Sequence, residues 1–197
     1  GARLDSEYGN KNRNYDFYLS YNNTTKEDQK IVDETKLGLE YDSRFFEQLS
    51  WYSKTDLEND QLEEIDLRAT SALGLKYSWI ENTRYKLAVR SGIAFRFEEY
   101  GLTNEDNVDA FAMDFGLEYS HIIKDLLSLQ SDITFIPSVE KFSDYLVTKD
   151  TALVIPLDKD SNWNLRTGID GTYNSTPVKN KEELDLKYYM RIVYRLN

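Results

Sequence analysis

The sequence of 197 residues contains no cysteine, one histidine and three prolines, and these scarcities exclude several kinds of chemistry. Without cysteine there is no disulfide framework, no thiolate metal site and no cysteine nucleophile. One histidine cannot build a zinc site of histidines and cysteines. Acidic residues (35) outnumber lysines and arginines (24), and the formal charge of -11 argues against binding to a nucleic-acid backbone. No run approaches the ~18 apolar residues of a membrane-spanning helix.

What the sequence does contain is apolar residues at every second position, repeated along the chain. Between Tyr85 and Phe97 the odd positions are mainly apolar, whereas the even positions include lysine, arginine and glutamate. A period of two indicates a β-strand with one polar face, because a helix needs apolar residues three and four positions apart. The pattern predicts about eleven strands. They centre on residues 4–8, 15–21, 37–41, 49–53, 65–77, 85–97, 111–119, 127–135, 151–157, 163–169 and 184–196.

The connections between these strands are predicted to alternate in length. Short turns are expected near residues 9–10, 42–43, 81–82, 124–125 and 158–159, and longer polar loops near 23–34, 55–64, 98–109, 136–144 and 174–185. Strands that run up and down bring all short turns to one end and all long loops to the other, as in outer-membrane barrels. The prolines agree, since Pro137 and Pro177 lie in predicted loops and Pro156 ends a strand.

Alternation alone leaves two architectures open, a soluble β-sandwich that hides its apolar face and a membrane barrel that exposes it to lipid. Strands of about 10–16 residues are long for a soluble sheet but suit a tilted membrane strand. About eleven strands form a cylinder too wide to fill with apolar side chains alone. Aromatic residues suited to the membrane–water interface end the apolar stripes, namely Tyr77, Trp79, Tyr85, Tyr119, Trp163, Tyr173 and Tyr194. We therefore predict an all-β fold, a single up-and-down antiparallel transmembrane β-barrel domain over residues 1–197.

The membrane interpretation assigns a role to each face. The predicted lipid-facing residues are Leu87, Val89, Ile93, Phe95, Phe111, Met113, Phe115 and Leu117. The predicted lumen-facing charges are Arg68, Lys86, Arg90, Arg96, Asp114, Glu118, Arg166, Asp170, Lys187 and Arg191. Two hypotheses stay open for these charges: a structural network of opposite charges that occludes the lumen, and a narrow charge-lined conduit.

Acidic residues gather in two of the predicted loops, as Asp56, Glu58, Asp60, Glu63, Glu64, Glu105 and Asp106. Neither segment places oxygens at alternate positions around a glycine, as a calcium loop does. We expect a solvated acidic rim, with loose divalent bridging to lipopolysaccharide phosphates as the alternative. His121 enters a predicted short turn, the wrong end for the catalytic histidine of a barrel protease or phospholipase. We therefore expect no enzyme activity, no cofactor and no metal site.

Segments at the centre and at the end of the chain carry a family resemblance. They are Gly74-Leu75-Lys76-Tyr77, Leu87 through Gly92, Phe95-Arg96-Phe97-Glu98-Glu99, Asn174-Ser175-Thr176-Pro177 and Leu184 through Leu196. Together they resemble the YdiY-like family of salt-induced outer-membrane proteins, grouped as a domain of unknown function. The resemblance implies an up-and-down barrel of about twelve strands, so we expect the family's first strand to lie before Gly1.

The resemblance also implies a location and a set of partners. The location is the outer membrane of a Gram-negative bacterium, with outer-membrane lipid and lipopolysaccharide around the barrel. The barrel-assembly machinery is the expected partner during biogenesis, and no nucleic acid is expected. The expected role is a structural one in the envelope, linked to salt or osmotic response, with a narrow porin-like channel for small solutes or ions as the alternative.

Overall fold

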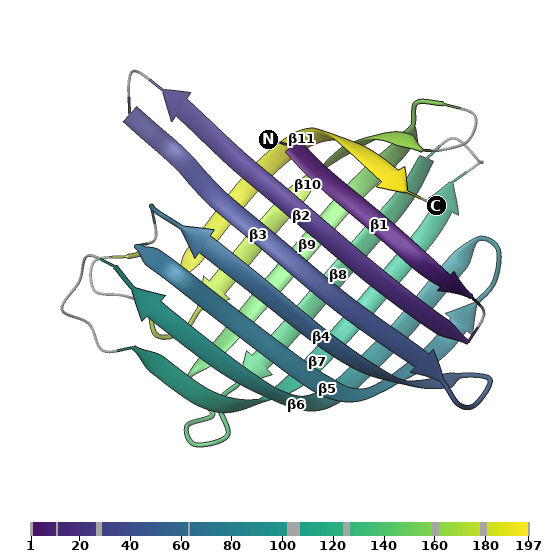
Figure 1. Ribbon diagram of the computed structural model, residues 1–197, viewed down its shortest axis with the longest axis horizontal. Coiled ribbons are helices and arrows are strands. Elements are labelled where there is room, and N and C mark those ends of the chain that lie inside the picture. The colour runs from purple at the N-terminus through teal and green to yellow at the C-terminus, as the bar shows by residue number, and fades with distance from the viewer. Residues whose placement is uncertain are drawn as a thin grey trace.

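The computed structural model is a closed ring of eleven β-strands (Figure 1). It describes residues 2–10, 12–26, 29–62, 64–101, 107–123, 127–158, 162–177 and 181–196. The strands are β1 (Ala2–Asn10), β2 (Arg13–Lys26), β3 (Gln29–Arg44), β4 (Leu49–Asp60), β5 (Ile65–Glu81), β6 (Tyr85–Tyr100), β7 (Val108–Ile123), β8 (Leu127–Pro137), β9 (Tyr145–Pro156), β10 (Trp163–Asn174) and β11 (Leu184–Leu196). Among the described residues there is no helix long and apolar enough to cross a membrane.

Each strand pairs antiparallel with its neighbours in sequence, and the ring closes where β1 meets β11 in parallel. In an up-and-down ring successive strands alternate in direction, so an odd number of strands must bring two of the same direction together. This parallel ladder has four residue pairs, from Arg3 with Val193 to Ser6 with Leu196, whereas the β1–β2 ladder has nine. The predicted all-β barrel is therefore confirmed, with eleven strands and one parallel pair.

The connections define two ends of the barrel, which we call the turn end and the loop end. The ends of the strands at the β1–β2, β3–β4, β5–β6, β7–β8 and β9–β10 junctions lie at the turn end, and those at the β2–β3, β4–β5, β6–β7, β8–β9 and β10–β11 junctions lie at the loop end. Two of the predicted long loops are wrong. Strands β2 and β3 fill most of 23–34, and β4 continues through most of 55–64. The polar composition of these two segments led to the wrong prediction, because polar residues that line a polar lumen resemble those of a loop.

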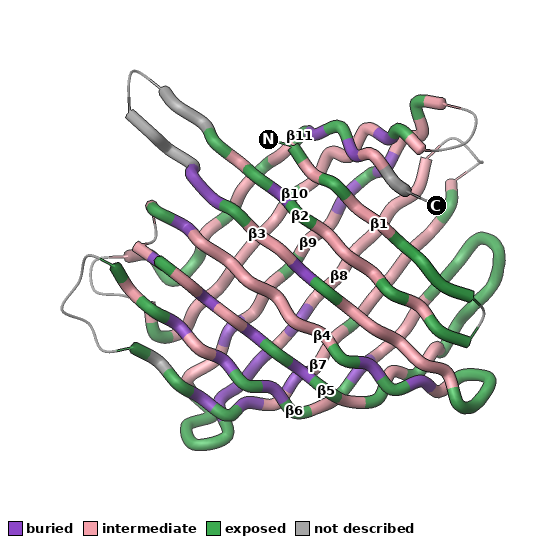
Figure 2. Tube along the Cα trace, in the orientation of Figure 1, coloured by how far each residue is buried: buried purple, intermediate pink, exposed green. Residues whose placement is uncertain are grey.

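The outer surface of the barrel is apolar and its interior is polar, so exposure changes from residue to residue along many strands (Figure 2). Ile93 and Phe111 are each 68% exposed, whereas Arg90 is 4% exposed. The β6–β7 register pairs Ile93 with Met113 and Phe95 with Phe111, and all eight predicted lipid-facing residues share this outer face. An exposed apolar surface of this extent is far larger than the patches of soluble monomers.

Glycines on the inner face make room for large side chains in the lumen. A Cβ at Gly38 would collide with the ring of Tyr18, and a Cβ at Gly116 would collide with the side chain of Arg90. These side chains therefore lie directly over the backbone of the neighbouring strand. A small apolar cluster lines one wall of the lumen and consists of Tyr52, Ala72, Ala94, Ala112, Ile136 and Leu146.

Candidate functional site in the barrel lumen

Three cavities follow one another through the lumen from the turn end to the loop end. The first, which we call the vestibule, has a volume of about 920 Å³ and is lined by polar residues of the turn end. The central cavity has a volume of about 320 Å³, and the loop-end cavity one of about 40 Å³. Three residues line both the vestibule and the central cavity, namely Glu40, Asp132 and Arg166. The central and loop-end cavities share Glu58, Arg68 and Thr172. The volume of these three cavities thus decreases toward the loop end.

Arg90 on β6 is the centre of a network between the vestibule and the central cavity. Its Nε donates to Asp114 at 3.1 Å, and its Nη1 donates to Glu118 at 3.0 Å and to Asp132 at 3.3 Å. The hydroxyl of Tyr52 donates to the same Asp114 at 2.5 Å. Four strands thereby meet around one guanidinium group. Pairing of this kind is what allows charges to be buried, because an unpaired charge in such a place is strongly destabilising.

Lys76 on β5 continues this network along the wall of the vestibule. Its Nζ lies 2.7 Å from a carboxylate oxygen of Glu118 and 3.4 Å from oxygens of Glu40 and Asp42. Lys76 therefore links β3, β5 and β7 and shares Glu118 with Arg90. The network is continuous over six strands, β3 to β8, and holds the barrel wall together from within.

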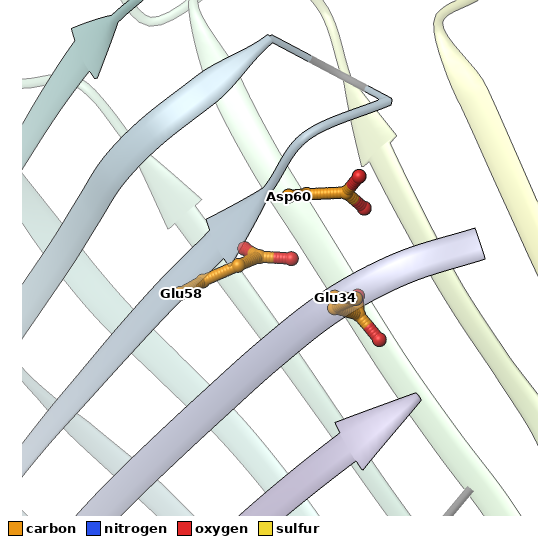
Figure 3. A group of neighbouring side chains, drawn as sticks. All are labelled: Glu34, Glu58 and Asp60. Atoms are coloured by element: carbon orange, nitrogen blue, oxygen red, sulfur yellow. The ribbon is translucent and has the colours of Figure 1, made fainter. Parts of the chain in front are cut away.

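A second network lies beside the loop end and contains three carboxylates, Glu34 on β3 and Glu58 and Asp60 on β4 (Figure 3). Their oxygens lie within 4.8 Å of one another, a spacing that could hold a metal ion. The ammonium group of Lys36 lies 2.8 Å from Glu34 and 3.3 Å from Glu58. That of Lys187 lies 3.0 Å from Glu34 and 3.1 Å from Asp60. Lysines thus neutralise these carboxylates, and a metal ion would have to displace them.

Ion pairs and hydrogen bonds also connect opposite walls and neighbouring connections at the loop end. Lys36 reaches Asp170 of β10 at 3.6 Å. Lys181, in the connection 175–183, lies 3.7 Å from Glu64 and donates a hydrogen bond to the carbonyl oxygen of Leu62. These contacts cross the barrel between the β3–β5 side and the β10–β11 side, and Lys36 and Asp170 line the central cavity.

The structure places the ten predicted lumen charges on the inner face, but it corrects three of the predicted loop acids. Asp56, Glu58 and Asp60 belong to β4, where alternation continues and points them into the lumen. Asp56 accepts a hydrogen bond from Tyr18 at 2.8 Å. Glu64 does lie in a connection, 61–64, whereas Glu63, Glu105 and Asp106 lie outside the described residues. The prediction of a solvated acidic rim is therefore wrong for the three β4 residues, whose carboxylates have partners inside the lumen.

Aromatic side chains form a girdle on the outer face of the turn end. Six of the seven predicted interface aromatics lie there, and Tyr173 lies at the loop end. A chain of ring contacts joins Tyr8, Tyr15, Tyr41 and Trp51 across β1 to β4, with centroid separations of 6.4, 4.6 and 4.9 Å. His121 is part of this girdle, because its ring stacks on Tyr85 with centroids 4.4 Å apart.

Sequence reasoning missed three tyrosines on the inner face, Tyr18, Tyr52 and Tyr189. Besides the bonds of Tyr18 and Tyr52, the hydroxyl of Tyr189 donates to Asp150 at 2.5 Å. The signal was present, because each tyrosine falls between the positions of the apolar stripe of its strand. Such an aromatic residue belongs to the polar face and has to satisfy its hydroxyl there.

The fold and the lumen define a class of protein, a closed β-barrel with an apolar exterior and an ion-paired, narrowing interior. The chain belongs to the family described as "Protein of unknown function, DUF481", whose family model matches residues 1–196. A comparison with curated proteins finds no match. The match supports the family as a whole, and the resemblance to its YdiY-like members stays a prediction.

Proposed function

We propose that this chain is an outer-membrane β-barrel of a Gram-negative bacterium, of the YdiY-like kind, with a structural role in the envelope and an occluded lumen. The observation that carries the proposal is the inversion of exposure, with apolar side chains outside and charges inside. Lipid is the solvent that such an exterior requires, and a closed barrel leaves no open strand edge in it. The proposal includes lipopolysaccharide as a neighbour, insertion by the barrel-assembly machinery, and no enzymatic activity or cofactor.

The orientation follows from the two ends of the barrel. Short turns of outer-membrane barrels face the periplasm, so the vestibule is proposed to open there and the loop end to face outward. The Tyr and Trp girdle of the turn end would then lie at the periplasmic interface of the membrane. The location is tested by fractionation and by gel migration of heated and unheated samples. We expect recovery with outer membranes and heat-modifiable migration, and recovery with soluble proteins would contradict the proposal.

Occlusion is supported by the small volume of the loop-end cavity, about 40 Å³, and by ion pairs that cross the lumen, such as Lys36 with Asp170. We expect the wild-type barrel in planar bilayers to give no steady stepwise currents. The double variant Glu34→Ala/Lys187→Ala removes one carboxylate and one ammonium group of the loop-end network and is expected to conduct. The matched control is Arg44→Ala/Glu81→Ala, which removes an ion pair at the turn end whose nitrogen and oxygen are 2.9 Å apart. We expect this control to give no current.

A narrow porin-like channel is the second candidate, favoured by one observation. The three cavities share lining residues, so a continuous series of polar spaces extends along the lumen. Steady stepwise currents from the wild-type barrel would support this candidate and refute the occluded lumen. The link to salt or osmotic response rests on the resemblance alone. Its test is the growth of a deletion strain across a range of salt concentrations, where unchanged growth would remove the link.

A further inference from the structure

Arg191 on β11 differs from the other arginines that line the central cavity. It is 5% exposed, and its Nε has no hydrogen-bond partner. Within the described part of the chain, no carboxylate oxygen lies within 4.0 Å of its guanidinium nitrogens. The other three arginines of the cavity each have such a partner: Arg3 with Asp5 at 2.7 Å, Arg68 with Glu98 at 3.0 Å and Arg166 with Asp150 at 3.0 Å. A buried charge without a close counter-charge is costly, so Arg191 is the arginine of this cavity best placed to pair with an anion from outside the chain.

Tyr189 holds the guanidinium group of Arg191 in place. The Cζ of Arg191 lies 3.6 Å from the centroid of the Tyr189 ring, the distance of a stacked cation–π contact. The Tyr189 hydroxyl is itself fixed, because it accepts from Arg166 at 3.0 Å and donates to Asp150. Stacking uses the face of the guanidinium plane and leaves its N–H groups at the edge, the geometry that recognises an oxyanion.

Two further arginines lie near Arg191, and each is already paired with an aspartate, Arg3 with Asp5 and Arg166 with Asp150. Arg166 on β10 lies directly opposite Arg191 in the ladder, and both face the lumen. Like charges at directly opposed positions destabilise a sheet unless something neutralises them, and Asp150 does this for Arg166 but not for Arg191. Arg3 on β1 is in register with Val193, two residues beyond Arg191 on β11. Asp170 also lines this cavity, where it lies 3.6 Å from the ammonium group of Lys36 and interacts electrostatically with Arg191 beyond the distance of an ion pair.

We propose that the arginine wall, formed by Arg3, Arg166 and Arg191, binds one small oxyanion in the central cavity. Phosphate, sulfate and the carboxylate of a small acid share the required chemistry, two oxygens that accept from one guanidinium edge. Arg191 supplies the free N–H groups, and Arg166 lies directly opposite it in the ladder. Arg166 also lines the vestibule, so an anion can reach the wall from the turn end.

The test is equilibrium dialysis of the purified barrel in detergent micelles against radiolabelled inorganic phosphate at low ionic strength. This assay needs no membrane, so its outcome is independent of the proposed location. We expect about one phosphate per chain, and Arg191→Gln should weaken binding at least about tenfold, because hydrogen bonds to a charged group are lost. Arg44→Gln makes the same change of charge in the vestibule, where Arg44 is paired with Glu81, and should leave binding unchanged.

The proposal is overturned if the wild-type barrel binds no phosphate, or if Arg191→Gln binds it as well as the wild type. A second measurement covers the case in which Arg191→Gln does not fold. Phosphate should raise the urea midpoint of the wild-type barrel and raise that of Arg191→Lys by less, because lysine keeps the charge but not the forked donors. An unchanged midpoint for the wild type, or equal shifts for both proteins, would also overturn it.

Discussion

At the turn end the lumen widens to a vestibule of about 920 Å³, whereas at the loop end it narrows to a cavity of about 40 Å³. Both ends are lined by lysine, arginine, aspartate and glutamate. At the turn end, Arg44 pairs with Glu81, whose side chain is 46% exposed. At the loop end, Glu34 is 1% exposed and binds two lysines from different strands. The same residue types therefore surround the largest of the three cavities at one end and the smallest at the other.

The largest effect is expected where the two halves of the lumen meet, at Arg90. Arg90→Ala leaves Asp114 and its neighbours without their shared counter-charge, and should cost about 3–5 kcal/mol in free energy of unfolding. Urea unfolding in phospholipid vesicles, followed by tryptophan fluorescence, measures this. Arg44→Ala at the turn end is the control and should cost less than about 1 kcal/mol. Equal losses would mean that the centre of the lumen is as hydrated as the vestibule.

A smaller difference is expected between two glycines, one beneath a central side chain and one at the loop end. A Cβ at Gly116 collides with Arg90, which is held by three carboxylates, so Gly116→Ala should cost about 1–3 kcal/mol. A Cβ at Gly101 meets only the carboxylate of exposed Asp66, which can move aside. Gly101→Ala should therefore cost less than about 1 kcal/mol. The same unfolding assay compares the two variants. A larger loss of stability for Gly101→Ala than for Gly116→Ala would contradict the tight packing of Arg90 over Gly116.

A third comparison uses carboxylates of the two ends. Glu34→Gln keeps the shape but removes the charge that Lys36 and Lys187 share, and should destabilise the barrel by about 1–2 kcal/mol. Asp42→Asn weakens only the ion pair between Asp42 and Lys76, in which the nitrogen and oxygen are 3.4 Å apart. Lys76 keeps its closer ion pair with Glu118, at 2.7 Å. Its expected cost is below about 1 kcal/mol. Equal costs would show that the loop-end network is no more tightly held than the vestibule.

The smallest effect is expected in the connection 61–64 at the loop end. Glu64 has φ of 60°, in the left-handed region that a side chain disfavours. Glu64→Gly should raise the free energy of unfolding by about 0.5–1 kcal/mol, because glycine removes this strain. Gln61→Gly, in the same connection but without a positive φ, should bring no such gain. A loss of stability on Glu64→Gly would show that its pairing with Lys181 outweighs the strain.

The strands that sequence reasoning located best are those whose two faces differ most. In β6 and β7 the apolar stripe is nearly unbroken, so the strands and their outer faces followed from period two alone. In β4 the outer face carries Ser53, Thr55 and Asn59, which hid the alternation and led to a predicted loop. The extent of β4 was set by its pairing with β3 and β5, information that no local window contains.

The sequence by itself determined a strand-rich fold, the division of its strands into an apolar and a polar face and the approximate number of strands. These follow from a short-range rule, because side chains of a strand alternate between two sides. Only the tertiary structure decided which charges meet, such as Lys36 with Asp170 and Lys187 with Glu34. It also decided that Arg191 lacks a carboxylate partner, which depends on ring closure and ladder register. Those contacts join residues far apart in the chain, and burial rather than sequence spacing determines their strength.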